Sequence, residues 1–300
     1  MTLSKTPLIY VIILNWNLPH FTINCVESVL ESNYPNFKTL VVDNGSSDNS
    51  SAILRNYFEN RIELLTLPVN LGFGQGNNQG IKFALQSGAE YILLINNDTC
   101  IDPNMITELC DCALSDRNIG IAGPIIYYSE QPQKIWFSGI RYWKQLYVLQ
   151  RGIHLTADFE KIEDVDFISG CGMLVNRVVW EKIGLFSPEY FMYYEDQDFC
   201  LNAKKAGFRI VTATQAKMWH HIASSSGGSE SASKRYNQVK SSVIFYRKHT
   251  HGIGFLVNIF LRIINAFWAA LKLLLKGGIK IEVIKWYIKG IKEALNYKSV

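Results

Sequence analysis

Short apolar runs alternate with amphipathic segments over the first third of the chain. The apolar runs are rich in branched side chains, which is typical of buried strands, and they cover residues 8–14, 38–42, 62–67 and 91–95. Between them, helical patterns cover residues 19–32, 49–58 and 75–86, and Gly88 ends the third of these helices. This alternation predicts an α/β fold with a mostly parallel sheet flanked by helices.

The same reasoning extends through the second third of the chain. Further strands are expected at residues 119–128, 167–175 and 208–212, and helices at residues 177–183 and 196–206. Residues 132–163 are less regular and rich in aromatic side chains, which can stack on a sugar ring or simply form a satellite core.

Polar residues follow the fourth predicted strand at once, as Asn96, Asn97 and Asp98. Ligands of open α/β sheets bind at the carboxyl ends of strands, where Asp98 offers a hard oxygen to a divalent cation. The alternative is a plain polar turn, since these residue types favour turns. Asp102 and Pro103 then predict the start of a helix.

Two more segments in the first third carry candidate chemistry. Asp43 ends the second strand, where an acid can accept hydrogen bonds from a nucleotide, whereas Asp48 is explained by a turn and helix cap. The stretch from Asn70 to Gly80 contains four glycines but does not match GxGxxG. Glycines there would let backbone amides approach a ligand before a helix that starts at Gln75.

The second half contributes an acidic cluster and a histidine pair. Glu195, Asp196 and Asp198 open a helix; acids there complement the helix dipole, but three in four residues leave room for a general base. His220 and His221 precede a Ser/Gly-rich run at residues 224–229, where they could ligate a metal or phosphate and the run could close over substrate.

Composition narrows the possible classes. With 300 residues and 48% hydrophobic content, the chain fits one large domain or a domain with an appendage. The six cysteines form no CxxC pair, which favours reduced thiols and a cytosolic compartment. The apolar run near the N-terminus is short and lacks a cleavage site, so a strand is favoured over a signal peptide.

Charge is divided unevenly along the chain. Residues 234–300 carry 13 basic and two acidic residues, whereas residues 1–233 have a net charge of −7. The basic end is also apolar, which suits an anionic membrane surface better than nucleic acid. Residues 252–275 contain polar interruptions that a spanning helix would avoid, and residues 276–298 fit an interfacial helix or a helix packed on the domain. We therefore divide the chain into residues 1–230 and a helical extension, 231–300.

Seven motifs in order resemble a family 2 glycosyltransferase of the GT-A fold, in its bacterial rhamnosyltransferase-like branch. They are VIILNWN, VVDNGSSD, NLGFGQGNNQGI, LLINNDT, SGCGMLV, YYEDQDFCLNAKKAGF and WHHIASSSG, and the likeness covers residues 7–248. It implies that Asp98 is the last acid of a DXD-like element that holds Mn²⁺ or Mg²⁺. His220 would complete this metal site, and His221 is the second choice for that role. The element reads NND here, with a single carboxylate.

The resemblance also implies the remaining roles. Asp196 matches the catalytic base, and Glu195 is the second choice for that role. The donor nucleotide side would be formed by Asp43, Asn44, Gly72, Asn77, Asn78 and Asn97. The implied reaction is an inverting transfer from a nucleoside-diphosphate sugar, UDP- or dTDP-linked, to a hydroxyl of a glycan or lipid-linked acceptor. Cell-surface polysaccharide synthesis, at the inner membrane face or in the cytoplasm, would be the setting.

Two other functions compete with this interpretation. A sugar-nucleotide nucleotidyltransferase would use a similar sheet, but it needs a basic, glycine-rich loop near the N-terminus, and residues 8–24 contain no Lys, Arg or Gly. A non-catalytic, membrane-associated glycan-binding subunit would not need the carboxylates Asp98, Glu195 and Asp196. Turnover of a sugar nucleotide separates both from a glycosyltransferase.

Overall fold

The computed structural model describes residues 6–142, 150–152, 160–221, 232–252 and 254–258, with shorter pieces up to residue 293. The strands are β1 (Ile9–Asn15), β2 (Phe37–Asn44), β3 (Glu63–Leu67), β4 (Tyr91–Asn96), β5 (Thr99–Ile101), β6 (Ile119–Tyr128), β7 (Gln131–Phe137), β8 (Ile140–Tyr142), β9 (Gln150–Gly152), β10 (Ile162–Asp164), β11 (Gly172–Asn176) and β12 (Arg209–His220). The helices are α1 (Pro19–Leu30), α2 (Ser50–Phe58), α3 (Gly72–Gln86), α4 (Met105–Ser115), α5 (Arg177–Ile183), α6 (Glu195–Lys205) and α7 (Ala232–His249).

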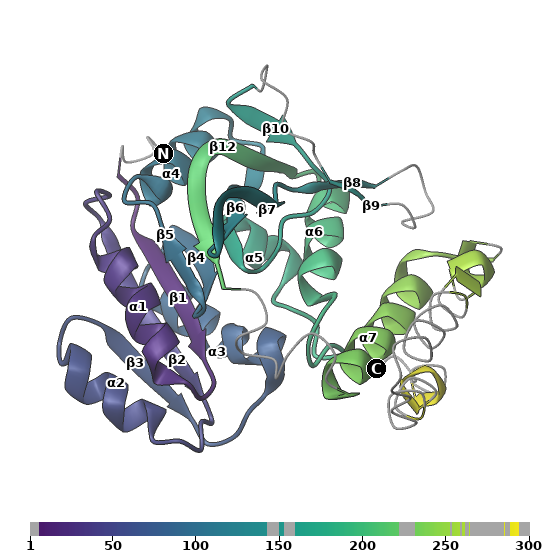
Figure 1. Ribbon diagram of the computed structural model, residues 1–300. Coiled ribbons are helices and arrows are strands. Elements are labelled where there is room, and N and C mark those ends of the chain that lie inside the picture. Colours follow the sequence, from purple (N-terminus) through teal and green to yellow (C-terminus); the bar gives the residue numbers. More distant parts are fainter. Residues whose placement is uncertain are drawn as a thin grey trace.

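One mixed sheet forms the centre of the molecule (Figure 1). Its main path runs β10-β12-β6-β11-β4-β1-β2-β3, and β5 and β7 pair with β12 and β6. Strands β1 to β4 are parallel, as the alternation of strands and helices predicts, and β12 is parallel to β6. Strand β11 lies antiparallel between β4 and β6, so the sheet is α/β in its first half and mixed in its second.

Both faces of the central strands β1 and β4 are buried, which explains why these strands are almost entirely apolar. In β1, Ile9, Val11 and Ile13 belong to one core, which includes residues of α1, α2 and α4, whereas Tyr10 and Ile12 belong to the other, with α3, α5 and α6. All six cysteines are free thiols, and only Cys100 is not fully buried, as expected for reduced cysteines.

The structure corrects several predicted boundaries. Helix α3 begins at Gly72, three residues earlier than expected. The helix expected after Asp102 begins only at Met105, because residues 99–101 pair with β12 and Asp102 instead accepts a bond from the amide of Asn104. The expected 167–175 strand begins at Gly172, and the last strand runs on to His220 with an irregularity in its register.

The extension begins with α7, which packs on the sheet domain. A third apolar cluster joins Tyr190, Tyr194 and Leu201 to Val243, Phe245 and neighbouring residues of α7. The predicted helices at 252–275 and 276–298, the 224–229 run and part of the aromatic region lie largely outside the described residues. Within the described part of the chain, each helix is too short or too polar to span a bilayer.

Candidate active site

Asp98 and His220 meet where β4 and β12 end. Asp98 lies in the turn between β4 and β5, and β5 pairs with β12 so that Thr99 is opposite His220. Asp98 Oδ1 lies 3.1 Å from Nε2 of His220, and both side chains are buried. His221 instead points its imidazole toward Glu130, at 3.5 Å, and only its backbone amide bonds to Asp98. The structure therefore brings His220, the first choice, to the predicted metal site.

The surroundings of His220 favour its charged form. Trp136 packs edge-on against the imidazole, with ring centroids 4.7 Å apart. Burial opposes protonation, but the neighbouring Cys171 and Asp98 outweigh it and raise the pKa of His220 to about 10. The Nδ1 atom of His220 is buried and has no hydrogen-bond partner among the described residues.

This donor pair fits a divalent cation that is shared with a substrate. Nε2 of His220 must lose its proton to bind an ion, so a cation would replace the hydrogen bond that now joins His220 to Asp98. No three His, Cys, Asp or Glu side chains in the described ranges are placed to hold an ion. A cation bound here would therefore have few protein ligands and keep positions for water and phosphate oxygens, as Mg²⁺ sites at nucleotides do.

Asp43 is connected to the metal side by a chain of buried amides and hydroxyls. Asn15 donates to Asp43 Oδ1 over 2.9 Å and accepts a bond from Thr22, whose hydroxyl oxygen accepts one from Asn97 over 3.0 Å. Asp43 Oδ1 also accepts a bond from Ser46, whereas Oδ2 accepts none from the described residues. The chain fixes the ends of β1, β2 and β4 relative to one another and leaves one oxygen of Asp43 for a ligand.

The other predicted donor residues have structural partners. Asn44 holds the turn before α3 through Asn70, Leu71 and Gly72. Asn78 forms two hydrogen bonds with the backbone of Phe186, and the amide of Asn77 bonds to its own helix. These amides hold α3 and the segment before Glu195 together, and a contact of Asn44, Asn77 or Asn78 with the donor stays a prediction.

The glycines of α3 allow close packing, and the approach of a ligand to this stretch stays a prediction. A Cβ at Gly76 would lie 2.8 Å from Leu14, and one at Gly80 would lie 2.9 Å from Ile12 and Val42. Gly72 has φ +82° and sits against the carbonyl of Phe191, which a Cβ would approach to 2.2 Å. The glycine spacing therefore reflects helix–sheet and helix–loop contact.

Glu195 and Asp196 open α6 in different environments. Asp196 is partly exposed, and its Oδ2 and Oδ1 accept bonds from the backbone amides of Gly170, at 3.0 Å, and Gln197, at 2.8 Å. Glu195 is buried, and its Oε2 has no partner among the described residues. Burial raises the pKa of Asp196 to about 6, whereas burial and the charge of Asp196 raise that of Glu195 well above its usual value.

Asp198 has a partner set that the sequence did not reveal. This carboxylate is 3% exposed and lies 2.6 Å from Nε2 of His249 and 2.9 Å from Nζ of Lys248. Tyr190 and Asn202 also donate to it. The third acid of the cluster therefore anchors α7 to α6. In the sequence, the only sign of this contact is the short basic run at the end of α7.

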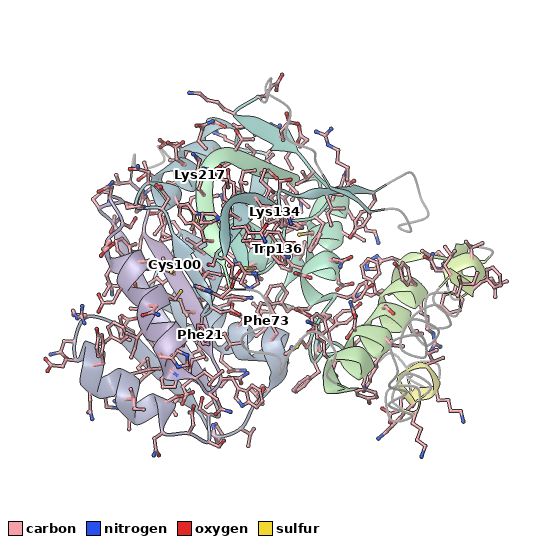
Figure 2. All side chains as sticks on the ribbon, in the orientation of Figure 1. Phe21, Phe73, Cys100, Lys134, Trp136 and Lys217 are labelled. Atoms are coloured by element: carbon pink, nitrogen blue, oxygen red, sulfur yellow. The ribbon has the colours of Figure 1, made fainter. Side chains whose placement is uncertain are left out.

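These groups form one continuous site, as the chain between Gly170 and Cys171 shows. Cys171 lies beside His220, and the amide of Gly170 donates to Asp196. Two residues that are adjacent in the chain therefore contact the candidate metal ligand His220 and the candidate base Asp196. Phe21, Phe73 and Trp136 come from α1, α3 and β7 and are labelled in Figure 2. Their rings contact His221, Gly170 and His220 around the same strand ends.

Comparison with known proteins assigns this site to a family. The model of glycosyl transferase family 2 matches residues 10–184, more than half of the chain. The chain belongs to glycosyltransferase family 2. It is 26% identical to the dTDP-rhamnosyl transferase RfbF of Shigella flexneri over 248 residues, which cover 80% of each chain. It is 29% identical to an N-acetylglucosaminyl-diphospho-decaprenol L-rhamnosyltransferase of Mycobacterium tuberculosis (strain H37Rv), over 69% of this chain and 73% of the relative.

A solved structure supports the fold of this glycosyltransferase. The crystal structure of GalNAc-T7 with UDP, GalNAc and Mn²⁺ superposes with a TM-score of 0.67 and 14% identity. It covers 81% of this chain, which spans about half (48%) of the solved chain. The predicted GT-A fold and the rhamnosyltransferase-like family are thus confirmed, and neither the nucleotidyltransferase nor the non-catalytic subunit is favoured.

Proposed function

We propose that this glycosyltransferase transfers rhamnose from dTDP-rhamnose to a hydroxyl of a lipid-linked glycan, with inversion at the anomeric carbon. The single observation that carries the mechanism is the placement of Asp196. Two backbone amides hold its carboxylate, and the neighbour of one of them, Cys171, lies beside the Asp98–His220 pair. The names of the two rhamnosyltransferase relatives support the donor, and the second also supports an acceptor built on a diphospho-lipid.

In this mechanism the acceptor hydroxyl oxygen attacks the anomeric carbon while its proton passes to Asp196. The new C–O bond forms as the bond from the anomeric carbon to the diphosphate oxygen breaks, and dTDP leaves with the electron pair. A pKa of about 6 keeps Asp196 ionised at neutral pH and close to the range in which a base works best. Attack opposite to the leaving group inverts the configuration.

Asp98 and His220 would hold a Mn²⁺ or Mg²⁺ ion, which supplies positive charge to the leaving diphosphate. Asp43, at the end of β2, would accept hydrogen bonds from the donor nucleoside through Oδ2, which accepts none from the described residues. Asn97 lies next to Asp98, and its amide is held by Thr22, so it would orient the turn that carries Asp98.

The test is a transfer assay with dTDP-rhamnose and N-acetylglucosamine linked through diphosphate to a short lipid. We expect release of dTDP and a rhamnosylated product whose anomeric configuration, read by NMR, is opposite to that of the donor. The Asp196→Asn variant is the matched control, because it should bind dTDP but not turn over. UDP- and GDP-sugars in parallel show whether another nucleotide is used. Retention of configuration, or equal turnover by the control, would reject the mechanism.

A further inference from the structure

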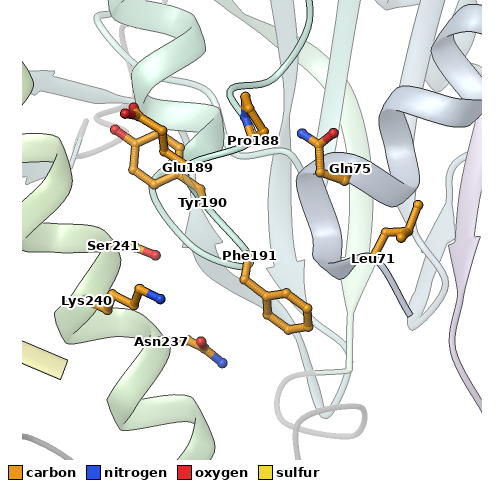
Figure 3. Close-up of a pocket in the computed structure, with 9 residues that line it drawn as sticks. All are labelled: Leu71, Gln75, Pro188, Glu189, Tyr190, Phe191, Asn237, Lys240 and Ser241. Carbon is orange, nitrogen blue, oxygen red and sulfur yellow. The ribbon is translucent and has the colours of Figure 1, made fainter. Parts of the chain in front are cut away.

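A small groove lies between α7 and the sheet domain, close to the catalytic helix (Figure 3). It measures about 190 Å³, which is the scale of one sugar ring. One wall consists of Leu71 and Gln75, at the start of α3, and of residues 188–191. The other wall consists of Asn237, Lys240 and Ser241 of α7. Among these residues, only Leu71 and Gln75 lie in a segment that the sequence singled out, the glycine-rich stretch, and the mechanism above uses none of them.

The groups that line this groove suit a neutral polyhydroxylated ligand. Phe191 is 46% exposed and offers an aromatic surface, with Asn237 on the facing helix (Figure 3). Within the described ranges, the amide of Asn237 has no hydrogen-bond partner, and Gln75 uses only its Nε2, which donates to Phe186. These groups therefore supply both donors and acceptors.

The charges of the groove balance, which disfavours an anionic occupant. Lys240 is 3.8 Å from Glu293, and its ammonium group lies over the ring of Tyr236. Glu189 contributes a carboxylate to the opposite wall. A phosphate or diphosphate in the groove would face the ammonium group of Lys240, which is shared with Glu293, and the nearby carboxylate of Glu189. A sugar hydroxyl can hydrogen-bond to either group.

Backbone contacts place this groove directly behind the candidate base. The amide of Phe73 donates to the carbonyl of Phe191 over 2.8 Å, and the ring of Phe73 contacts Gly170, which binds Asp196. Gly74 packs against Glu195. The start of α3 therefore has the groove on one side and the catalytic carboxylates on the other.

Two contacts fix α7 as the second wall of the groove. The hydroxyl of Ser241 donates to the carbonyl of Met192 over 2.8 Å. At the far end of the helix, His249 and Lys248 bind the buried carboxylate of Asp198, which lies two residues after Asp196. The position of α7 is thus tied to the helix that carries the base, and a wall held at its middle and at its C-terminal end is pre-organised for binding.

We propose that this groove is a subsite for one neutral sugar unit of the acceptor, completed by Asn237 and Lys240 of α7. The proposal rests on the proposed glycosyl transfer, because it assigns the groove to the acceptor and not to the donor. The sugar stacks on Phe191 and hydrogen-bonds to Gln75 and Asn237. Helix α7 then belongs to the acceptor half of the active site.

The first experiment needs no turnover. Saturation-transfer NMR on the full-length chain, with methyl glycosides of N-acetylglucosamine, glucose, galactose and rhamnose, should detect binding of at least one. Asn237→Ala and Phe191→Ala should each remove that signal, whereas Gln238→Ala, next to Asn237 on α7 but outside the groove, should keep it. No bound glycoside, or binding that survives both groove variants, overturns the proposal whether or not the enzyme transfers rhamnose. Displacement of the glycoside by pyrophosphate would also overturn it, in favour of an anionic ligand.

The second experiment separates acceptor from donor in the transfer assay. Asn237→Ala should raise the acceptor KM about tenfold, the effect of losing one or two hydrogen bonds, with kcat and the Kd for dTDP unchanged. Gln238→Ala should match the wild type in all three. A raised Kd for dTDP in Asn237→Ala would assign the groove to the donor instead. If wild-type protein transfers no sugar, the proposed function fails and the NMR result alone decides the groove.

Discussion

The backbone amide of Gly170 donates a hydrogen bond to Asp196 Oδ2 over 3.0 Å, and the amide of Gln197 holds the other oxygen. These bonds keep the carboxylate in one orientation, while its partial exposure leaves room for a substrate hydroxyl. Replacing Asp196 with Asn keeps the shape but removes the proton acceptor. We expect kcat to fall by about two to four orders of magnitude, with dTDP binding unchanged in calorimetry. A rate within tenfold of the wild type would contradict this role.

Glu195 should behave differently although it adjoins Asp196. Its carboxyl group is buried, Oε2 has no partner among the described residues, and burial and the charge of Asp196 raise its pKa well above the usual value. Glu195→Gln keeps the shape of the side chain and removes a charge that burial disfavours, so we expect it to lower kcat by less than about tenfold. Steady-state assays beside Asp196→Asn make the comparison. A loss as large as that of Asp196→Asn would move the role of base to Glu195.

The rate should depend on pH through the same carboxylate. Burial raises the pKa of Asp196 to about 6, and the base must be ionised to accept a proton. We therefore expect kcat/KM to be level above pH 7 and to fall about tenfold per pH unit below pH 6. A profile measured at constant ionic strength, with dTDP binding followed at each pH, checks this. An acid limb near pH 4 would mean that the base is an ordinary exposed carboxylate.

Removal of metal should weaken binding of the nucleotide. Asp98 and His220 are the two proposed protein ligands, so the diphosphate would have to supply further ligands to a bound ion. At a hundredfold excess over Kd, dTDP with Mn²⁺ should stabilise the protein by about 2.7 kcal/mol in thermal unfolding, and EDTA should abolish most of that gain. His220→Ala should also lose it, whereas His221→Ala, whose imidazole pairs with Glu130, should retain it. Equal stabilisation in EDTA would show that this NND element binds nucleotide without metal.

The sheet and the positions of its polar strand ends followed from periodicity, because apolar strands and crossover helices leave a direct pattern. Asp98 was predicted from its place at a strand end and His220 from its place in a histidine pair, the resemblance put both in one metal site, and the pairing of β5 with β12 brings them together. The packing role of the α3 glycines was missed, because their spacing is the same whether they face a ligand or a neighbouring strand. Only the contacts of Gly76 and Gly80 with β1 and β2 distinguish the two.

The sequence did not predict the contacts between segments that are far apart in the chain. The bonds of Asn78 to Phe186 and of His249 to Asp198 join residues 108 and 51 positions apart, and neither pair has a local pattern. The same holds for the groove at Asn237, whose walls come from α3, residues 188–191 and α7. Such sites depend on how the helices pack, which the period of one helix does not encode.

Asp198 should be important for stability as well as for the position of α7. Burial acts to raise the pKa of Asp198, but hydrogen bonds from His249 and Lys248 outweigh it and hold that pKa below its usual range. Asp198→Asn leaves the ammonium group of Lys248 and the imidazole of His249 facing a buried amide, so we expect a loss of about 3–5 kcal/mol in urea unfolding at pH 7. Asp116→Asn, which breaks the more exposed pair with Arg209, should cost much less. Equal losses in the two variants would mean that the Asp198 pair contributes no more than a surface contact.

The effect of Asp198 on stability should depend on pH. A carboxyl pKa that is lowered in the folded state stabilises the fold at pH values above the pKa of the unfolded chain, and this stabilisation is lost at lower pH. The difference in stability between Asp198→Asn and wild type should therefore shrink as the pH falls below about 4.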